Sequence, residues 1–182
     1  MSLTTIIATG LGLAVGSFLN VVIYRLPVMA KRNAIKNAVP KVRELHEADN
    51  TDPVYDLSKP FNLNIPRSAC PSCNHQITAI ENIPVLSWLA LRGKCRGCKK
   101  PISSRYPLIE LLNAAVWGLT AIIFYNQIYL ITIICLLSST FICIIATKVD
   151  NQKTPNSLYF VSFVLCGLLL LSCLFDHVIS FL

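Results

Sequence analysis

QIYLITIICLLSSTFICIIAT, residues 127–147, contains no charged side chain. A helix needs roughly 20 such residues to cross the ~30 Å hydrocarbon core of a bilayer. Three further apolar stretches of similar length lie at residues 4–24, 107–125 and 157–175. Together the four stretches predict an all-α polytopic membrane protein with about four transmembrane helices.

Composition and charge agree with this class. Hydrophobic residues make up 54% of the 182 and charged residues only 14%, whereas soluble domains carry about 25% charged residues. The 16 Lys and Arg residues all follow either the first or the third apolar stretch. Because basic loops stay in the cytoplasm, we expect residues 25–106 and the connector 148–156 there, and the N-terminus and the tail 176–182 outside.

We interpret the first apolar stretch as a retained anchor rather than a secretory signal or a buried soluble helix. No Lys or Arg precedes it, and basic residues follow it from Arg25 on, which reverses the charge order of a signal peptide. Gly12 and Gly16 share one face of this helix, and small residues at that spacing allow close helix packing. We expect this face to contact another helix. Asn20, one turn further on, either joins that contact or lines a polar site.

Residues 27–59 change to a polar composition in which charged and small apolar residues are mixed. We expect one or two short surface helices and a linker here, with breaks at Pro40, Pro53 and Pro60. Such a surface is ordinarily solvated, although a charge-rich helix beside a bilayer can also rest on anionic lipid.

Two C-x-x-C pairs, Cys70-Pro-Ser-Cys73 and Cys95-Arg-Gly-Cys98, lie in the same loop at a spacing close to that of zinc ribbons. Four thiolates form a closed tetrahedral site for structural zinc, and the surrounding Lys and Arg residues favour the thiolate form. The sequence therefore predicts a cytoplasmic zinc-ribbon-like domain whose metal ligands are Cys70, Cys73, Cys95 and Cys98.

Other states of these cysteines remain open. Structural disulfides are rare in the cytoplasm, and an iron site or a redox dithiol is a further alternative. His75 could replace one cysteine as a ligand, but with four cysteines present we interpret it as a surface histidine. The remaining cysteines lie within the apolar stretches, where we expect small hydrophobic side chains; they are Cys135, Cys143, Cys166 and Cys173.

GSFLNVVIYRLP, residues 16–27, resembles the opening signature of the bifunctional prepilin leader peptidase/N-methyltransferases of type IV pilus and type II secretion systems. Further motifs of that family follow in order and spacing, so that the resemblance covers roughly residues 10–158. They are FNL from Phe61, PRSACPSCNH at 66–75, NIP from Asn82, SW at 87–88, LRGKC at 91–95, and ISSRYP at 102–107 followed by Glu110.

The resemblance implies a membrane aspartyl protease that cuts the prepilin leader on the cytoplasmic side and then methylates the new N-terminus with S-adenosylmethionine. It also implies prepilin or pseudopilin leader peptides and the lipid bilayer as partners, and the bacterial inner membrane as the location. We expect no nucleic-acid partner, because Trp88 is the only aromatic residue between the two cysteine pairs.

The same resemblance assigns roles to particular residues. Asp150, in an Asp-x(4)-Pro-Asn context, matches the first of the family's two catalytic aspartates, whereas its position alone would make it a solvated charge at the end of a span. Gly93 and Lys94 match positions of the methyltransferase half and are implied to bind the cofactor.

One motif departs from the family. Its second catalytic aspartate belongs to a Gly-x-Gly-Asp sequence that does not occur before Leu182, so the resemblance predicts a C-terminally shortened chain with an incomplete peptidase half. Two other acids are not expected to replace this aspartate: Asp176 should lie on the outer face, and Glu110 has no catalytic role in the family. Two copies of Asp150 could pair in a dimer. A non-catalytic membrane scaffold or relic with a zinc-stabilised docking loop is the alternative function. The sequence leaves the oligomeric state open.

Overall fold

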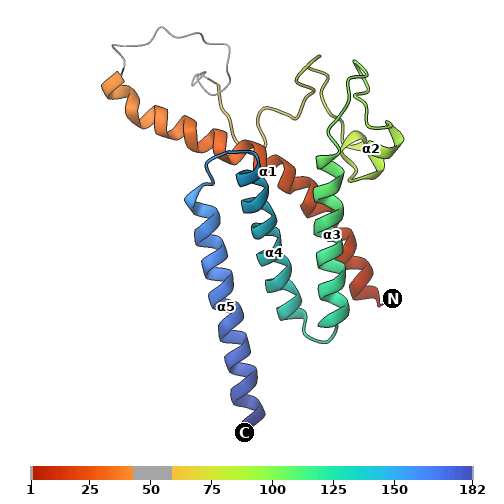
Figure 1. The fold of residues 1–182 in the computed structure, drawn as a ribbon, viewed down its shortest axis with the longest axis vertical. Helices are drawn as coiled ribbons and strands as arrows, with labels where there is room; N and C mark the ends of the chain where they lie inside the picture. The colour runs from red at the N-terminus through yellow and green to blue at the C-terminus, as the bar shows by residue number, and fades with distance from the viewer. Residues whose placement is uncertain (1, 43–58, 182) are drawn as a thin grey trace.

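The computed structural model describes residues 2–42 and 59–181, with side chains over 2–37 and 59–172, and its regular secondary structure there is helical. These residues contain no strand, only the isolated bridges Ala69↔Gln76 and Lys94↔Pro101. Figure 1 shows the helices, which are α1 (Leu3–Val42), the 3-10 turn η1 (Ile80–Asn82), α2 (Leu86–Ala90), α3 (Arg105–Ile123), α4 (Ile128–Val149) and α5 (Asn156–Phe181). The predicted all-α class is confirmed.

Three helices are long and apolar enough to cross a membrane: α1 over Leu3–Asn37, α3 and α4. In α5 the described apolar part, Asn156–Ser172, is shorter, so the fourth span stays a prediction. The helix itself continues to Phe181, and the expected external tail therefore extends α5. Many large apolar side chains on these helices are exposed, as expected for surfaces that face lipid.

Helix α1 is longer than the sequence suggested. It is continuous from Leu3 to Val42, so the break expected at Pro40 is wrong, and Pro53 lies outside the described residues. A proline inside a helix costs about 3 kcal/mol, but Pro27 is fully buried, and its packing offsets this cost. In Figure 1 the second half of α1 extends beyond the upper ends of α4 and α5.

The extension of α1 holds the start of the cysteine loop. The guanidinium of Arg25 is buried and donates hydrogen bonds to the carbonyls of Asn62 (2.8 Å) and Pro66 (2.6 Å). Arg25 and Arg32 also lie over the ring of Phe61, at 5.6 and 5.4 Å from its centroid. These contacts fix the loop to the side of α1.

Helices α1 and α3 pack closely through the two glycines of α1. A Cβ atom on Gly12 would lie 2.8 Å from Cα of Ala114, and one on Gly16 would lie 2.7 Å from Cα of Glu110. The expected helix-packing face is confirmed. Asn20 joins it, because its amide donates to the carbonyl of Tyr106 at 3.2 Å.

A buried polar network connects α1, α3 and α4. The amide of Asn113, which is fully buried, donates to the carbonyl of Gly12 at 2.8 Å and accepts from the hydroxyl of Ser139 at 2.8 Å. The indole of Trp117 donates to the same hydroxyl at 3.0 Å. Because unpaired polar groups are costly inside a membrane, this network specifies the register of the three helices.

Candidate metal centre and the aspartate at the membrane surface

The two cysteine pairs lie in backbone turns with the same hydrogen-bond pattern. In the first turn the N–H of Cys70 donates to the carbonyl of His75 (2.9 Å), and the carbonyl of Cys70 accepts from the N–H of Asn74 (2.9 Å). In the second turn the N–H of Cys95 donates to the carbonyl of Lys100 (2.8 Å), and its carbonyl accepts from the N–H of Lys99 (3.0 Å). Asn74 and Lys99 both adopt left-handed φ values, 55° and 61°. Each turn presents two sulfurs on one side, which is the geometry that a shared metal ion requires.

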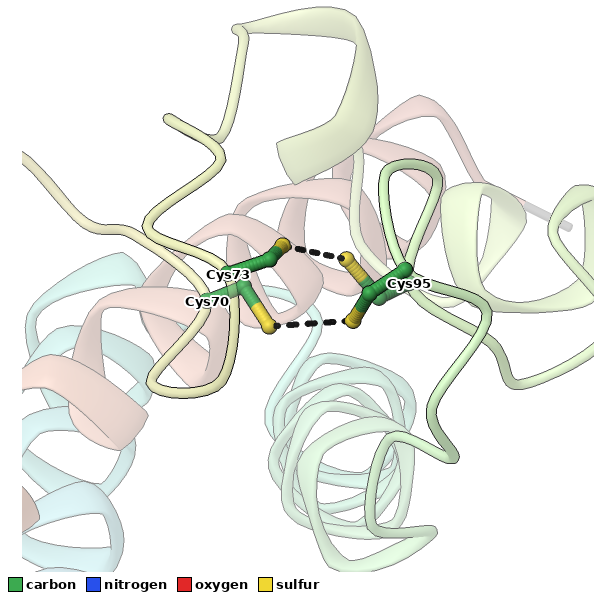
Figure 2. A group of neighbouring side chains, drawn as sticks. Cys70, Cys73 and Cys95 are labelled. Carbon is green, nitrogen blue, oxygen red and sulfur yellow. Dashed lines mark hydrogen bonds between the residues drawn. The ribbon is translucent and has the colours of Figure 1, made fainter.

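The four sulfurs form one cluster, and every Sγ lies within 4.8 Å of the others. Figure 2 shows the two facing pairs, with Cys70 Sγ 3.8 Å from Cys98 Sγ and Cys73 Sγ 3.9 Å from Cys95 Sγ. A tetrahedral zinc site with Zn–S bonds of about 2.3 Å has sulfur–sulfur edges of about 3.8 Å. All four cysteines are free thiols, and the cluster has the size of a four-thiolate metal cage.

Backbone amides point at the sulfurs. The N–H groups of Ser72 and Cys73 donate to the sulfur of Cys70 and lower its pKa to about 6. The N–H of His75 also lowers the pKa of Cys73, but desolvation and contacts with the other three sulfurs outweigh it and raise that pKa to about 11. Four thiolates this close repel one another, and a divalent cation would compensate their charge.

His75 lies beside the cluster, outside the group of four ligand atoms. Its side chain is 33% exposed, and its Nε2 lies 3.1 Å from a carboxylate oxygen of Glu81, a contact that the sequence did not predict. The carboxylate of Glu81 accepts from the backbone N–H of Thr78 at 2.9 Å, which with His75 lowers its pKa to about 2. The Thr-x-x-Glu spacing of residues 78–81 is a capping-box signature that could have revealed this carboxylate.

Gly93 ends α2 in a tight turn. Its N–H donates to the carbonyl of Trp88 at 2.8 Å, its carbonyl accepts from Ile102 at 2.7 Å, and its φ is +66°. A Cβ atom there would lie 2.8 Å from Cζ2 of Trp88. Both peptide groups of Gly93 are therefore engaged in the fold, and the neighbouring side chain of Lys94 is exposed at the edge of the second cysteine turn.

Asp150 lies at the end of α4, where the chain turns sharply. The helix ends in a Schellman turn around Asn151, which has a left-handed φ of 53°. The N–H of Asn151 donates to the carbonyl of Lys148, and the N–H of Gln152 donates to the carbonyl of Thr147. One carboxylate oxygen of Asp150 lies 2.7 Å from Nη1 of Arg105, the first residue of α3. This ion pair connects the start of α3, which follows the second cysteine pair, to the end of α4.

The family model for the bacterial peptidase A24 N-terminal domain matches residues 11–124. Relatives named prepilin leader peptidase/N-methyltransferase include those of Aeromonas hydrophila, 56% identical over 56% of this chain and 33% of its own length, and Stutzerimonas stutzeri, 46% identical over 81% of this chain and 48% of its own. The relative from Dichelobacter nodosus is 43% identical over 80% of this chain and 49% of its own length.

This chain thus spans about a third to a half of the length of the curated relatives it matches. No solved structure matches it. The family match covers α1 from residue 11 on, the whole described part of the cysteine loop, and α3. The chain belongs to the family of the bacterial peptidase A24 N-terminal domain.

Proposed function

We propose that this chain is the loop-bearing part of a prepilin-processing enzyme, which removes the leader of a prepilin or pseudopilin and methylates the new N-terminus. The observation that carries the proposal is a cage of four sulfurs at metal-binding distances inside a family match whose relatives are named for both activities. The site would lie in the bacterial inner membrane, with residues 25–106 and 148–156 on the cytoplasmic side.

The metal in this proposal is a structural zinc ion held by Cys70, Cys73, Cys95 and Cys98. A closed four-sulfur site leaves no open position for substrate, so the ion would cross-link the two turns of the loop. The backbone N–H groups directed at Cys70 support its thiolate form, and the pair of His75 and Glu81 packs beside the cluster.

Asp150 supplies one carboxylate of the aspartyl pair in this proposal. Such a protease needs an ionised carboxylate to take a proton from water and a protonated one to donate to the scissile carbonyl. Among the described side chains, the group bonded to Asp150 is the cation Arg105, while Glu81 and Glu110 are bonded elsewhere. We therefore expect no leader cleavage by the 182-residue chain alone.

For the methyltransferase half we propose that Lys94 contacts S-adenosylmethionine and that Gly93 shapes the turn presenting it. The support is the exposed side chain of Lys94 beside a turn fixed by hydrogen bonds on both sides of Gly93. The cofactor carries a carboxylate that a lysine ammonium can pair with. Lys100, exposed on the same cysteine turn, is the matched control position.

The experiment uses the chain in proteoliposomes with a purified prepilin, with the mature pilin and with S-adenosylmethionine, read by mass spectrometry. We expect an intact leader, and a gain of one methyl group on the mature N-terminus that Lys94→Ala reduces at least tenfold and Lys100→Ala does not. Leader cleavage abolished by Asp150→Ala would contradict the incomplete peptidase. If neither reaction nor cofactor binding occurs, the chain is a non-catalytic scaffold.

A further inference from the structure

An apolar segment lies exposed inside the otherwise basic loop. IPVLSWLAL, residues 83–91, contains Ser87 as its only polar residue. In the structure Leu86 is 65% exposed, Leu89 57% and Ile83 43%. An exposed cluster of this kind on a water-facing loop marks a surface that another apolar phase covers.

One hydrogen bond gives the depth of this segment. The backbone N–H of Val85 donates to Oε2 of Glu110 at 2.7 Å, and Glu110 is buried between α1 and α3. Glu110 lies five residues after Arg105, the start of α3, which at 1.5 Å per residue is about 7.5 Å along the helix. The interfacial layer of a bilayer is about 5–8 Å thick on each side. With the start of α3 placed at the outer edge of this layer, the segment lies at the boundary between headgroups and acyl chains.

The surface of α3 at the same level continues this apolar patch. Leu108 is 64% exposed, Leu111 50% and Leu112 49%, all on a helix that is apolar enough to span a membrane. Figure 1 shows α2 beside the upper end of α3, on the side away from α4. The exposed leucines of α2 and those of α3 are thus carried by neighbouring elements.

The charges beside the segment fit a membrane surface. Arg92 and Lys94, both exposed, follow its last residue, and basic side chains at such a boundary extend toward anionic headgroups. Val85 has φ +59°, a strained backbone conformation for a β-branched residue. The hydrogen bond to Glu110 stabilises this conformation and holds the segment at its depth.

We propose that residues 83–91, with α2 at their centre, form an interfacial membrane element that inserts between lipid acyl chains next to α3. The occupant of this surface is the bilayer itself. The element fixes the cysteine loop against the membrane at a second point, in addition to the contacts of Arg25 and Arg32 with Phe61. This inference is independent of the proposed enzymatic activity.

Photo-crosslinking tests the proposal. Benzoylphenylalanine replaces Leu86 or Leu89 in the full chain in lipid nanodiscs, with Leu112 as the lipid-facing control and Lys100 on the second cysteine turn as the exposed control. We expect lipid adducts at Leu86 and Leu89 within about threefold of those at Leu112, and at least tenfold fewer at Lys100. Absence of lipid adducts at both leucines, or adducts to a second copy of the chain, would overturn the proposal.

A second measurement uses residues 83–91 without any substitution among them. In a Trp117→Phe variant the remaining tryptophan is Trp88, and its fluorescence is recorded in vesicles that carry bromine near the headgroups or at the chain ends. We expect at least twofold stronger quenching by the shallow bromines. Quenching by neither lipid would place α2 in water and contradict the inference.

Discussion

At the scale of single residues, the hydrogen bonds and packing of Gly93 give a structural reason for a glycine at this position. The resemblance implied a cofactor contact, but the structure shows a left-handed turn residue whose N–H and carbonyl are both bonded and whose α-carbon lies under the ring of Trp88. No pattern in the sequence contains that contact, because it depends on the path of the chain after α2.

Gly93→Ala should destabilise the cysteine loop by about 1–3 kcal/mol, since the new methyl group meets Trp88 at a strained φ. Thermal unfolding together with zinc retention measures this effect. Gly10→Ala is the matched control, because a Cβ atom there meets nothing within 4 Å. If Gly93→Ala unfolds like the parent chain but loses cofactor binding, Gly93 contacts the cofactor directly.

The ion pair of Arg105 and Asp150 should contribute little to stability. Both side chains are partly exposed, at 39% and 28%, and pairs of this kind are worth at most about 1 kcal/mol. A double-mutant cycle with Arg105→Gln and Asp150→Asn should give a coupling energy below that value which decreases further in high salt. A salt-independent coupling of several kcal/mol would show that the pair is buried in the membrane-bound protein.

At the scale of elements, α1 and α3 approach each other closely. The sequence predicted the face of α1 that makes this contact, but not its partner helix. The spacing of Gly12 and Gly16 indicated a packing face, and that face lies on α3. The length of α1 could not be predicted, because its continuation through Pro27 and Pro40 depends on tertiary contacts: Arg25 and Arg32 hold a loop segment that follows them by more than twenty residues.

Gly16→Ala should destabilise the α1–α3 pair by roughly 1–3 kcal/mol, because the added Cβ would meet the backbone of Glu110 at 2.7 Å. Alanine otherwise favours a helix over glycine by about 1 kcal/mol, so the sign of the change is diagnostic. Thermal unfolding in nanodiscs provides the measurement. Gly167→Ala, in open space on α5, should leave the melting temperature unchanged or higher. Equal melting of the two variants would contradict the close approach of α1 to α3.

At the scale of the whole molecule, the sequence predicted the parts of the fold that depend on local patterns. Apolar length indicated the helices long enough to cross a membrane, and the two C-x-x-C pairs indicated the cysteine cluster, because the spacing of its sulfurs is local within each turn. The depth of α2 could not be predicted, since it follows from one hydrogen bond between Val85 and Glu110, two residues on separate elements.

The partners of Asp150 and His75 were missed for the same reason. Arg105 reaches Asp150 because α3 begins where α4 ends, and Glu81 reaches His75 because the loop folds back over its own first turn. The Arg105–Asp150 contact requires the assembled helices. The His75–Glu81 contact lies within the loop and depends on how the loop folds.

The proposed zinc ion between the four sulfurs can be tested directly. Zinc X-ray absorption of the purified chain, combined with metal analysis, should give one zinc per chain with four sulfur ligands at about 2.3 Å. Cys70→Ser should release the ion, while His75→Ala should retain it. A folded loop without zinc, or a coordination shell that includes nitrogen, would contradict the four-cysteine metal centre.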